Sequence, residues 1–247
     1  MHADYQAPKD LLEGRIILIT GAGDGIGRAA AEAFAAHGAT VVLLGKTVPK
    51  LEQVYDAIEA AGGPTPAIYP MHLEGATPHD YEELATVLEN NFGRLDGILH
   101  NAASLPYLSR IKDYDVEDWL KALQVNLNAP FQLTQACMPL LEKSEDARVL
   151  FTTDSVGQTA KAFWGAYGVS KFAIEGLMQT LSAELENSSI RVNCIDPGPT
   201  RTALRKRAFP GEDNATLKAP EAVTPLYLWA MGPDSRDTHG QRLSWTE

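Results

Sequence analysis

The chain has 247 residues, of which 45% are hydrophobic and 21% are charged, a balance typical of a globular protein with one large core. Its formal net charge of −11 argues against a surface that binds nucleic acid or an anionic membrane. No apolar run approaches the roughly 18 residues that span a membrane. The polar N-terminus lacks the basic and apolar regions of a signal peptide, so we expect a cytoplasmic protein. Cys137 and Cys194 have no metal-ligand spacing, so we expect buried thiols and no metal site.

The first predicted elements are a strand, a glycine-rich turn and a helix. Residues 15–20 form a β-branched apolar run, Gly21, Gly25 and Gly27 follow it, and the Ala-rich segment 28–37 reads as a helix. Glycine lets the backbone approach a pyrophosphate, and a helix N-terminus offers free N–H groups and the positive end of a dipole. A plain tight turn is the alternative, but three glycines at these places favour half of a nucleotide-binding βαβ unit.

A second buried strand, 40–44, runs into Lys46. An acidic residue at this place would hold a ribose 2′-hydroxyl, whereas a basic one suits a 2′-phosphate. Lys46 therefore favours NADP(H) over NAD(H), although an exposed loop lysine is the alternative.

Strands continue to alternate with helices to the end of the chain. The later strands are expected over 67–69, 95–100, 148–153, 190–195 and 241–245. The later helices are expected over 48–61, 78–92, 116–143, 166–186 and 220–231, with Pro130 and Pro139 interrupting the third of these. The segment 203–219 reads as polar and irregular. This alternation predicts an α/β fold with a doubly wound parallel sheet of about seven strands, helices on both faces and a single domain over 1–247.

The helix over 166–186 carries Tyr167 and Lys171, four residues apart and so on one helix face. A phenol has a pKa of about 10, too high for ready proton exchange at neutral pH. An ammonium one turn away stabilises the phenolate and should lower that pKa. The pair therefore favours an acid/base role for Tyr167.

In order and spacing, these motifs resemble the short-chain dehydrogenase/reductase family over essentially the whole chain. They are Thr20-Gly21-x-x-x-Gly25-x-Gly27, His100-Asn101-Ala102-Ala103, Asn126, Ser155, Tyr167-x-x-x-Lys171 and Pro197-Gly198 with Thr202. The segments DLLEGRIILITGAGDGIGR, WGAYGVSKFAIEGLMQ and RVNCIDPGPTRT carry a narrower likeness to one bacterial branch. The resemblance implies a Rossmann-type fold and an oxidoreductase that moves a hydride between NADP(H) and a small carbonyl or alcohol.

The family resemblance also implies the roles of single residues. The catalytic set would be Asn126, Ser155, Tyr167 and Lys171, with Asn126 holding a water that links Lys171 to solvent. The cofactor-binding set would be Gly21, Asp24, Gly25, Ile26, Gly27, Lys46, Asn101, Ala102, Tyr167, Lys171, Pro197, Gly198 and Thr202.

One departure from the family pattern concerns the hydroxyl that assists the tyrosine. The family serine usually lies thirteen residues before the tyrosine, and Asp154 stands there, with Ser155 one residue late. Two like charges at about 4 Å repel by roughly 4 kcal/mol at an effective dielectric of 20, so a carboxylate beside a developing alkoxide is costly. Either Asp154 points away and Ser155 supplies the hydroxyl, or Asp154 is protonated and donates, or carbonyl reduction is lost. We favour Ser155.

The resemblance further implies a substrate lid at 203–219 and a homodimer or homotetramer paired through the helices over 116–143 and 166–186. An alternative function is a cofactor-binding or sensing module on the same fold with weak or no turnover, for which Asp154 is the indication.

Overall fold

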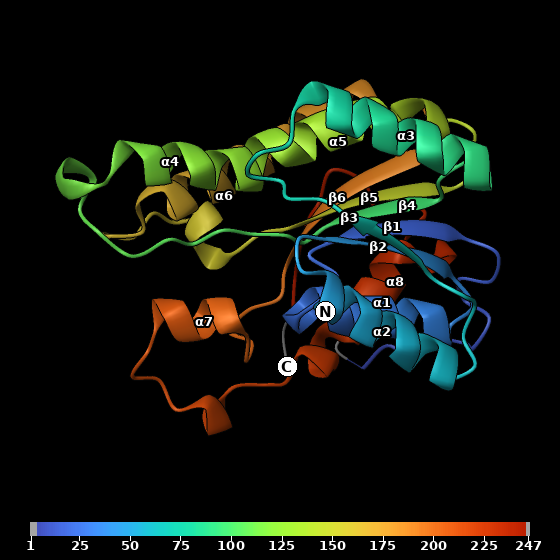
Figure 1. Ribbon diagram of the computed structural model, residues 1–247, viewed down its shortest axis with the longest axis horizontal. Coiled ribbons are helices and arrows are strands. Elements are labelled where there is room, and N and C mark those ends of the chain that lie inside the picture. Colours follow the sequence, from blue (N-terminus) through green and yellow to red (C-terminus); the bar gives the residue numbers. More distant parts are fainter. Residues whose placement is uncertain (1–3, 246–247) are drawn as a thin grey trace.

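A single sheet of parallel strands organises the computed structural model, which describes residues 4–245 (Figure 1). Its strands are β1 (Ile16–Thr20), β2 (Thr40–Gly45), β3 (Ala67–Pro70), β4 (Gly97–His100), β5 (Ala147–Thr152), β6 (Ile190–Asp196) and β7 (Arg242–Ser244). They lie in the order β3-β2-β1-β4-β5-β6-β7, and every neighbouring pair is parallel. The predicted doubly wound α/β fold with seven strands is confirmed.

Helices cover both faces of this sheet. They are α1 (Gly25–Ala36), α2 (Val48–Ala60), α3 (Pro78–Phe92), α4 (Val116–Leu123), α5 (Ala129–Leu141), α6 (Gly165–Glu184), α7 (Ala203–Ala208) and α8 (Thr224–Met231). Helices α1, α2 and α8 lie on one face and α3 to α6 on the other, whereas α7 stands away from the sheet (Figure 1). Apolar side chains of strands and helices fill a core on each face.

The strand order reverses between β1 and β4, so chain segments leave these two neighbouring strands toward opposite faces. In open α/β sheets, ligands bind in the crevice outside the carboxyl ends of the strands at such a switch point. The glycine turn follows β1, and Asn101 follows β4, so both predicted cofactor segments lie at this point.

The expected long helix over 116–143 differs from the structure in how it is interrupted. A π-helical turn, Gln124–Asn128, joins α4 to α5, whereas Pro130 lies in the first turn of α5 and Pro139 lies inside it. A proline in the first turn lacks an N–H that would have no partner there, so Pro130 does not break the helix. The prediction that the two prolines interrupt it is wrong.

Two further expectations change at the C-terminal end. The segment 203–219 is not wholly irregular, because α7 forms within it after Thr202, whose hydroxyl accepts the Arg205 N–H at 3.1 Å. The last expected helix begins with a 3₁₀ turn, Pro220–Val223, and becomes α-helical only in α8. Over residues 4–245, no helix is long and apolar enough to cross a membrane, and no cluster of side chains that could hold a metal is found.

Candidate active site

The glycine turn after β1 packs too tightly for any side chain at two positions. Gly21 has φ 68°, and a Cβ there would lie 3.0 Å from the Cα of Ala102. A Cβ on Gly27 would overlap the Gly21 carbonyl oxygen and lie 2.6 Å from Asn101 Nδ2. The turn therefore lets backbone alone face the crevice beside the N-terminus of α1, the environment that a pyrophosphate requires.

Asp24 sits at the start of α1 with both carboxylate oxygens occupied. Oδ1 accepts the Gly25 N–H at 2.8 Å, and Oδ2 pairs with Lys50 Nζ at 2.5 Å. The Lys50 hydrogen bond is the main cause that lowers the pKa of Asp24. Lys46 is exposed at the end of β2. Lys50, on α2, was not singled out from the sequence, although its side chain places a second ammonium beside the turn.

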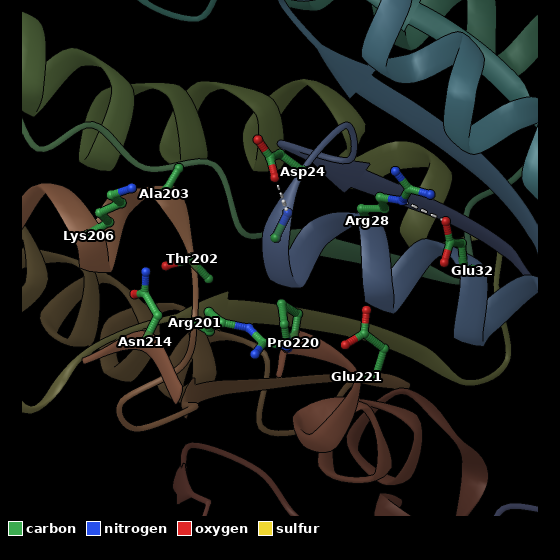
Figure 2. A pocket seen from close by; sticks show the side chains of 11 residues that line it. Asp24, Arg28, Glu32, Arg201, Thr202, Ala203, Lys206, Asn214, Pro220 and Glu221 are labelled. Atoms are coloured by element: carbon green, nitrogen blue, oxygen red, sulfur yellow. Dashed lines mark hydrogen bonds and ion pairs between the residues drawn. The ribbon is translucent and has the colours of Figure 1, made fainter. Parts of the chain in front are cut away.

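A cleft of about 430 Å³ opens between the start of α1 and the segment that carries α7 (Figure 2). Its lining combines the N-terminus of α1, at Asp24 and Gly25, with Thr202. Two cationic side chains, Arg201 and Lys206, line it from the other side. Three carboxylates, Asp24, Glu32 and Glu221, line the same cleft. The helix N-terminus and the two cations are the parts of the lining that suit the phosphates of a dinucleotide cofactor.

Further segments of the predicted cofactor set are fixed by side-chain hydrogen bonds. Thr20 Oγ1 accepts both the Asn101 and the Ala102 N–H at 3.0 Å, which ties the end of β4 to β1. The Gly198 N–H, at a residue with φ 63°, donates to Asp196 Oδ1 at 2.9 Å and shapes the loop after Pro197. Thr20 is a structural residue that the motif reading did not assign.

A chain of contacts connects the glycine turn to the Tyr167–Lys171 pair. Asn101, whose amide lies against Gly27, accepts from Thr152 Oγ1 at 3.4 Å through its Oδ1. The Thr152 carbonyl oxygen in turn accepts from Lys171 Nζ at 2.7 Å. The predicted cofactor cradle and the predicted acid/base pair are therefore brought together at the carboxyl ends of the strands.

Tyr167 is buried on α6, with 3% of its surface exposed, and its hydroxyl donates to Asp154 Oδ2 at 3.2 Å. Burial and then the Asp154 carboxylate raise the pKa of Tyr167 well above its usual value. Lys171 Nζ lies 5.4 Å from the centre of the Tyr167 ring and donates to Thr152 instead. The expectation that Lys171 lowers the pKa of Tyr167 is therefore wrong for this arrangement.

Lys171 is buried beside the tyrosine. Burial disfavours its charged form and lowers the pKa of Lys171 to about 8, against the opposing effect of Asp154 and Asp196. The hydrogen bond from Nζ to the Thr152 carbonyl fixes the ammonium at the end of β5. Near neutral pH this group is poised to gain or lose a proton.

The structure places Asp154, not Ser155, on the tyrosine. Ser155 is exposed, and its Oγ donates to Asp154 Oδ1 at 3.1 Å. The Val156 N–H donates to the same oxygen at 3.1 Å, so Asp154 caps the short 3₁₀ turn Ser155–Gly157. The expectation that Asp154 points away from Tyr167 is wrong. Aspartate and serine are both favoured at helix N-caps, so the sequence alone did not show which of the two residues would cap this turn.

Asn126 lies in the π-helical turn and is buried. Its Oδ1 accepts the Ser104 N–H at 2.6 Å, while Nδ2 donates to the Ser104 carbonyl and to Ser170 Oγ, both at 2.9 Å. The turn thus joins the loop after β4 to α6. Ser104 and Ser170 were not foreseen, because no motif marks them.

Arg242, on the edge strand β7, supports the same site from the C-terminal end of the chain. Its guanidinium pairs with Glu175 on α6 at 3.1 Å and with Asp196 at the end of β6 at 2.7 Å. It also donates to the Asp154 carbonyl oxygen at 3.3 Å. One cation therefore neutralises two acidic groups behind Tyr167 and holds the Asp154 backbone.

A buried cluster of apolar and aromatic side chains packs around the tyrosine. Leu105, Val156, Trp164, Tyr167 and Ala208 form it together with the partly buried Ala103, Leu204 and Phe209. The ring of Trp164 lies 5.6 Å from that of Tyr167 and 5.8 Å from that of Phe209, measured between centroids. The Tyr167 ring is therefore held among packed apolar side chains.

Comparisons with known proteins agree with this geometry. The family model described as short chain dehydrogenase matches residues 15–213. The oxidoreductase YciK of Escherichia coli K12 is 49% identical over 236 residues, covering 96% of this chain and 93% of the relative. The structure of a short chain dehydrogenase from Pseudomonas syringae superposes with a TM-score of 0.96 at 52% identity, covering 98% of both chains. Another, from Shigella flexneri 2a and solved in complex with NADP, superposes with a TM-score of 0.94 at 47% identity, covering 96% of this chain and 99% of that one.

Proposed function

The chain belongs to the short-chain dehydrogenase family, and we propose that it is an NADP(H)-dependent oxidoreductase of small carbonyl or alcohol substrates with Tyr167 as general acid or base. The observation that carries this proposal is the run of contacts from the glycine turn through Asn101 and Thr152 to Lys171. These contacts support a cofactor site and a proton donor close together at the carboxyl ends of the strands, as hydride transfer requires.

The nicotinamide, when bound, supplies or accepts the hydride. Tyr167 gives its proton to the substrate oxygen during reduction, and its raised pKa keeps the hydroxyl protonated beforehand. Lys171, with a pKa of about 8, supplies a proton that restores the Tyr167 hydroxyl after turnover. Asn126 holds the loop after β4 against α6, which keeps Tyr167 and Lys171 in position.

The cofactor proposal rests on a relative and on the charges of this chain. The Shigella flexneri relative was solved with NADP and is 47% identical to this chain. In this chain Lys46 stands exposed after β2, and Lys50 lies at the glycine turn beside Asp24. We assign Lys46 to the cofactor 2′-phosphate, with Gly21, Gly25, Ile26, Gly27, Asn101, Ala102, Pro197, Gly198 and Thr202 lining the rest of the crevice.

We also propose that the segment 203–219 is the substrate lid of a single domain over 1–247. Arg205 on α7 pairs with Glu212 at 2.6 Å, and Arg207 donates to the Leu105 carbonyl oxygen at 3.0 Å. These two contacts tie the segment to itself and to the loop after β4.

Pairing into a cytoplasmic homodimer or homotetramer completes the proposal. Large apolar side chains are exposed on the helices expected to pair: Val116 and Leu120 on α4, Phe131 on α5, and Val169 and Phe172 on α6. Light scattering on the purified chain should give an even multiple of 26.8 kDa. A monomer at micromolar concentration would contradict the pairing.

The decisive experiment is a titration with NADPH and NADH side by side, followed by a panel of aldehydes, ketones and quinones. We expect tighter binding of NADPH and its oxidation by at least one carbonyl compound. Tight binding of NADPH without oxidation by any of them would favour the second candidate, a cofactor-binding or sensing module, for which the carboxylate on Tyr167 is the specific observation.

A further inference from the structure

The group that faces the Tyr167 hydroxyl is an acceptor at both of its oxygens. Asp154 Oδ2 accepts from Tyr167, and Oδ1 accepts from the Val156 N–H and from Ser155 Oγ. Three neighbours are thus placed to donate to one carboxyl group. An ionised carboxylate is acceptor-only, whereas a protonated one must turn one oxygen into a donor. The Val156 N–H can only donate, whereas both hydroxyls can also accept, so all three contacts are compatible with the charged form.

Two other acids near the tyrosine, Glu175 and Asp196, form ion pairs with Arg242, whereas the Asp154 carboxylate does not. Arg242 pairs with Glu175 and with Asp196, and it reaches Asp154 only at the carbonyl oxygen. The three donors on the Asp154 carboxylate are all neutral groups. Lys171 is near enough for the Asp154 charge to act on its pKa, but its Nζ donates to the Thr152 carbonyl oxygen and forms no ion pair with Asp154. An incoming positive charge would therefore be stabilised at Asp154 more than at the two acids that Arg242 already neutralises.

The basic side chains of the α7 segment do not provide an opposite, anion-binding face at this place. Arg205 is held by both oxygens of Glu212, at 2.7 and 2.6 Å, and Arg207 donates to a carbonyl oxygen. Lys206 lines the cleft at the start of α1, opposite Asp24 (Figure 2). These contacts therefore give no reason to expect an anionic substrate at Tyr167.

A substrate oxygen that takes the Tyr167 proton lies within hydrogen-bond reach of that hydroxyl, and therefore close to Asp154 as well. Negative charge that develops on this oxygen is repelled by the carboxylate. A protonated nitrogen on the neighbouring carbon removes the repulsion, because it attracts the oxygen and donates to the carboxylate. The Phe209 ring already carries the Arg205 guanidinium, 3.9 Å from its centroid, so Asp154 is the group that would hold this nitrogen.

We propose that the substrate is a small amino ketone or the matching 1,2-amino alcohol, with its ammonium group bound by Asp154 beside the Tyr167 hydroxyl. This proposal rests on the function proposed above and names the substrate class of the same site. The reaction itself is unchanged, and Asp154 acts by selecting the charge of the substrate.

The test compares three alcohols of one shape with NADP⁺ as oxidant: 2-amino-1-phenylethanol, 1-phenylethane-1,2-diol and mandelate. We expect kcat/KM to fall from the amine to the diol by roughly tenfold to a hundredfold, the range of a charge-assisted hydrogen bond, and further to the anion. In Asp154→Asn and Asp154→Ser, which keep a side chain able to cap Val156, the ratio of amine to diol should approach one. The control Asp56→Asn removes the same charge from the exposed face of α2 and should keep the wild-type ratio.

A binding measurement separates this proposal from the general one. Calorimetry on the NADPH-loaded protein should show the amine binding at least tenfold tighter than the diol, and Asp154→Asn should abolish the difference. Equal affinities in the wild type, or a preference that survives Asp154→Asn, would overturn the inference. Failure to bind NADPH, or tight NADPH binding with no carbonyl reduced, would count against the proposed function, while the two affinities still decide the role of Asp154.

Discussion

The two ends of the site are built in different ways. The cofactor end is built mainly from backbone groups: the glycines, the N-terminus of α1, and the Asn101 and Ala102 backbone, whose N–H groups donate to Thr20 Oγ1. The proton-transfer end is side chain: Tyr167, Lys171 and Asp154, each buried or half-buried and each dependent on its neighbours. At the glycine turn, an added side-chain atom should disturb the packing of the backbone. At the proton-transfer end, a side chain can be replaced without that disturbance, but the chemistry of the site changes. The following variants test this contrast, from the largest expected effect to the smallest.

Tyr167→Phe should remove proton transfer and little else. We expect kcat to fall by about 10²–10⁴-fold, the usual contribution of general acid–base catalysis. The affinity for NADPH should stay within about threefold, because the cradle does not depend on the hydroxyl. Stopped-flow turnover and a fluorescence titration of NADPH check the two halves. Retained turnover would move the proton donor to Asp154.

Gly27→Ala should damage the opposite end. The new Cβ would overlap the Gly21 carbonyl oxygen and crowd Asn101, and overpacking of this kind costs about 1–3 kcal/mol. We expect a lower free energy of unfolding in urea and weaker NADPH binding. Gly75→Ala is the matched control, since a Cβ there meets nothing within 4 Å. Equal losses in both variants would argue that the turn has room after all.

Lys171→Met should change how stability depends on pH. The folded pKa is about 8 against 10.5 for a free lysine, so between these values the unfolded chain binds more protons than the folded one. Stability from this group therefore rises as the pH increases from about 8 toward 10.5. Urea unfolding at several pH values should show the wild type gaining on the variant across that window. A constant difference would mean that Lys171 titrates normally when folded.

Ser155→Ala should have the smallest effect. Ser155 is exposed and reaches Tyr167 only through Asp154, so we expect less than about a tenfold fall in kcat/KM. A fall as large as that of Tyr167→Phe would restore Ser155 as the hydroxyl that assists the tyrosine, as the sequence had favoured.

The same contrast explains how far the sequence could be read. Strands such as β1 and β2 are β-branched apolar runs, and the glycine spacing encodes backbone geometry directly, so fold and cradle were predictable. The π-helical turn could not be predicted, because one extra residue in a single turn leaves no periodic signal in the sequence. This turn carries Asn126, which bonds to Ser104 and Ser170. Whether Asp154 or Ser155 contacts Tyr167 depends on which of them caps the 3₁₀ turn through the Val156 N–H. Both residue types form such local hydrogen bonds, so the sequence does not decide between them.

The contacts of Arg242 bear on the order in which the site folds. Arg242 bonds to Asp154, Glu175 and Asp196, which lie 88, 67 and 46 positions earlier in the chain. Contacts of such separation are the slowest to form, and a growing chain that ends before β7 lacks them altogether. Tyr167 and Lys171 would already be folded onto the sheet while the acids behind them still repel each other. Strand β7 follows the other six described strands in the chain, so its Arg242 completes the support of the site after Tyr167 and Lys171 are in place.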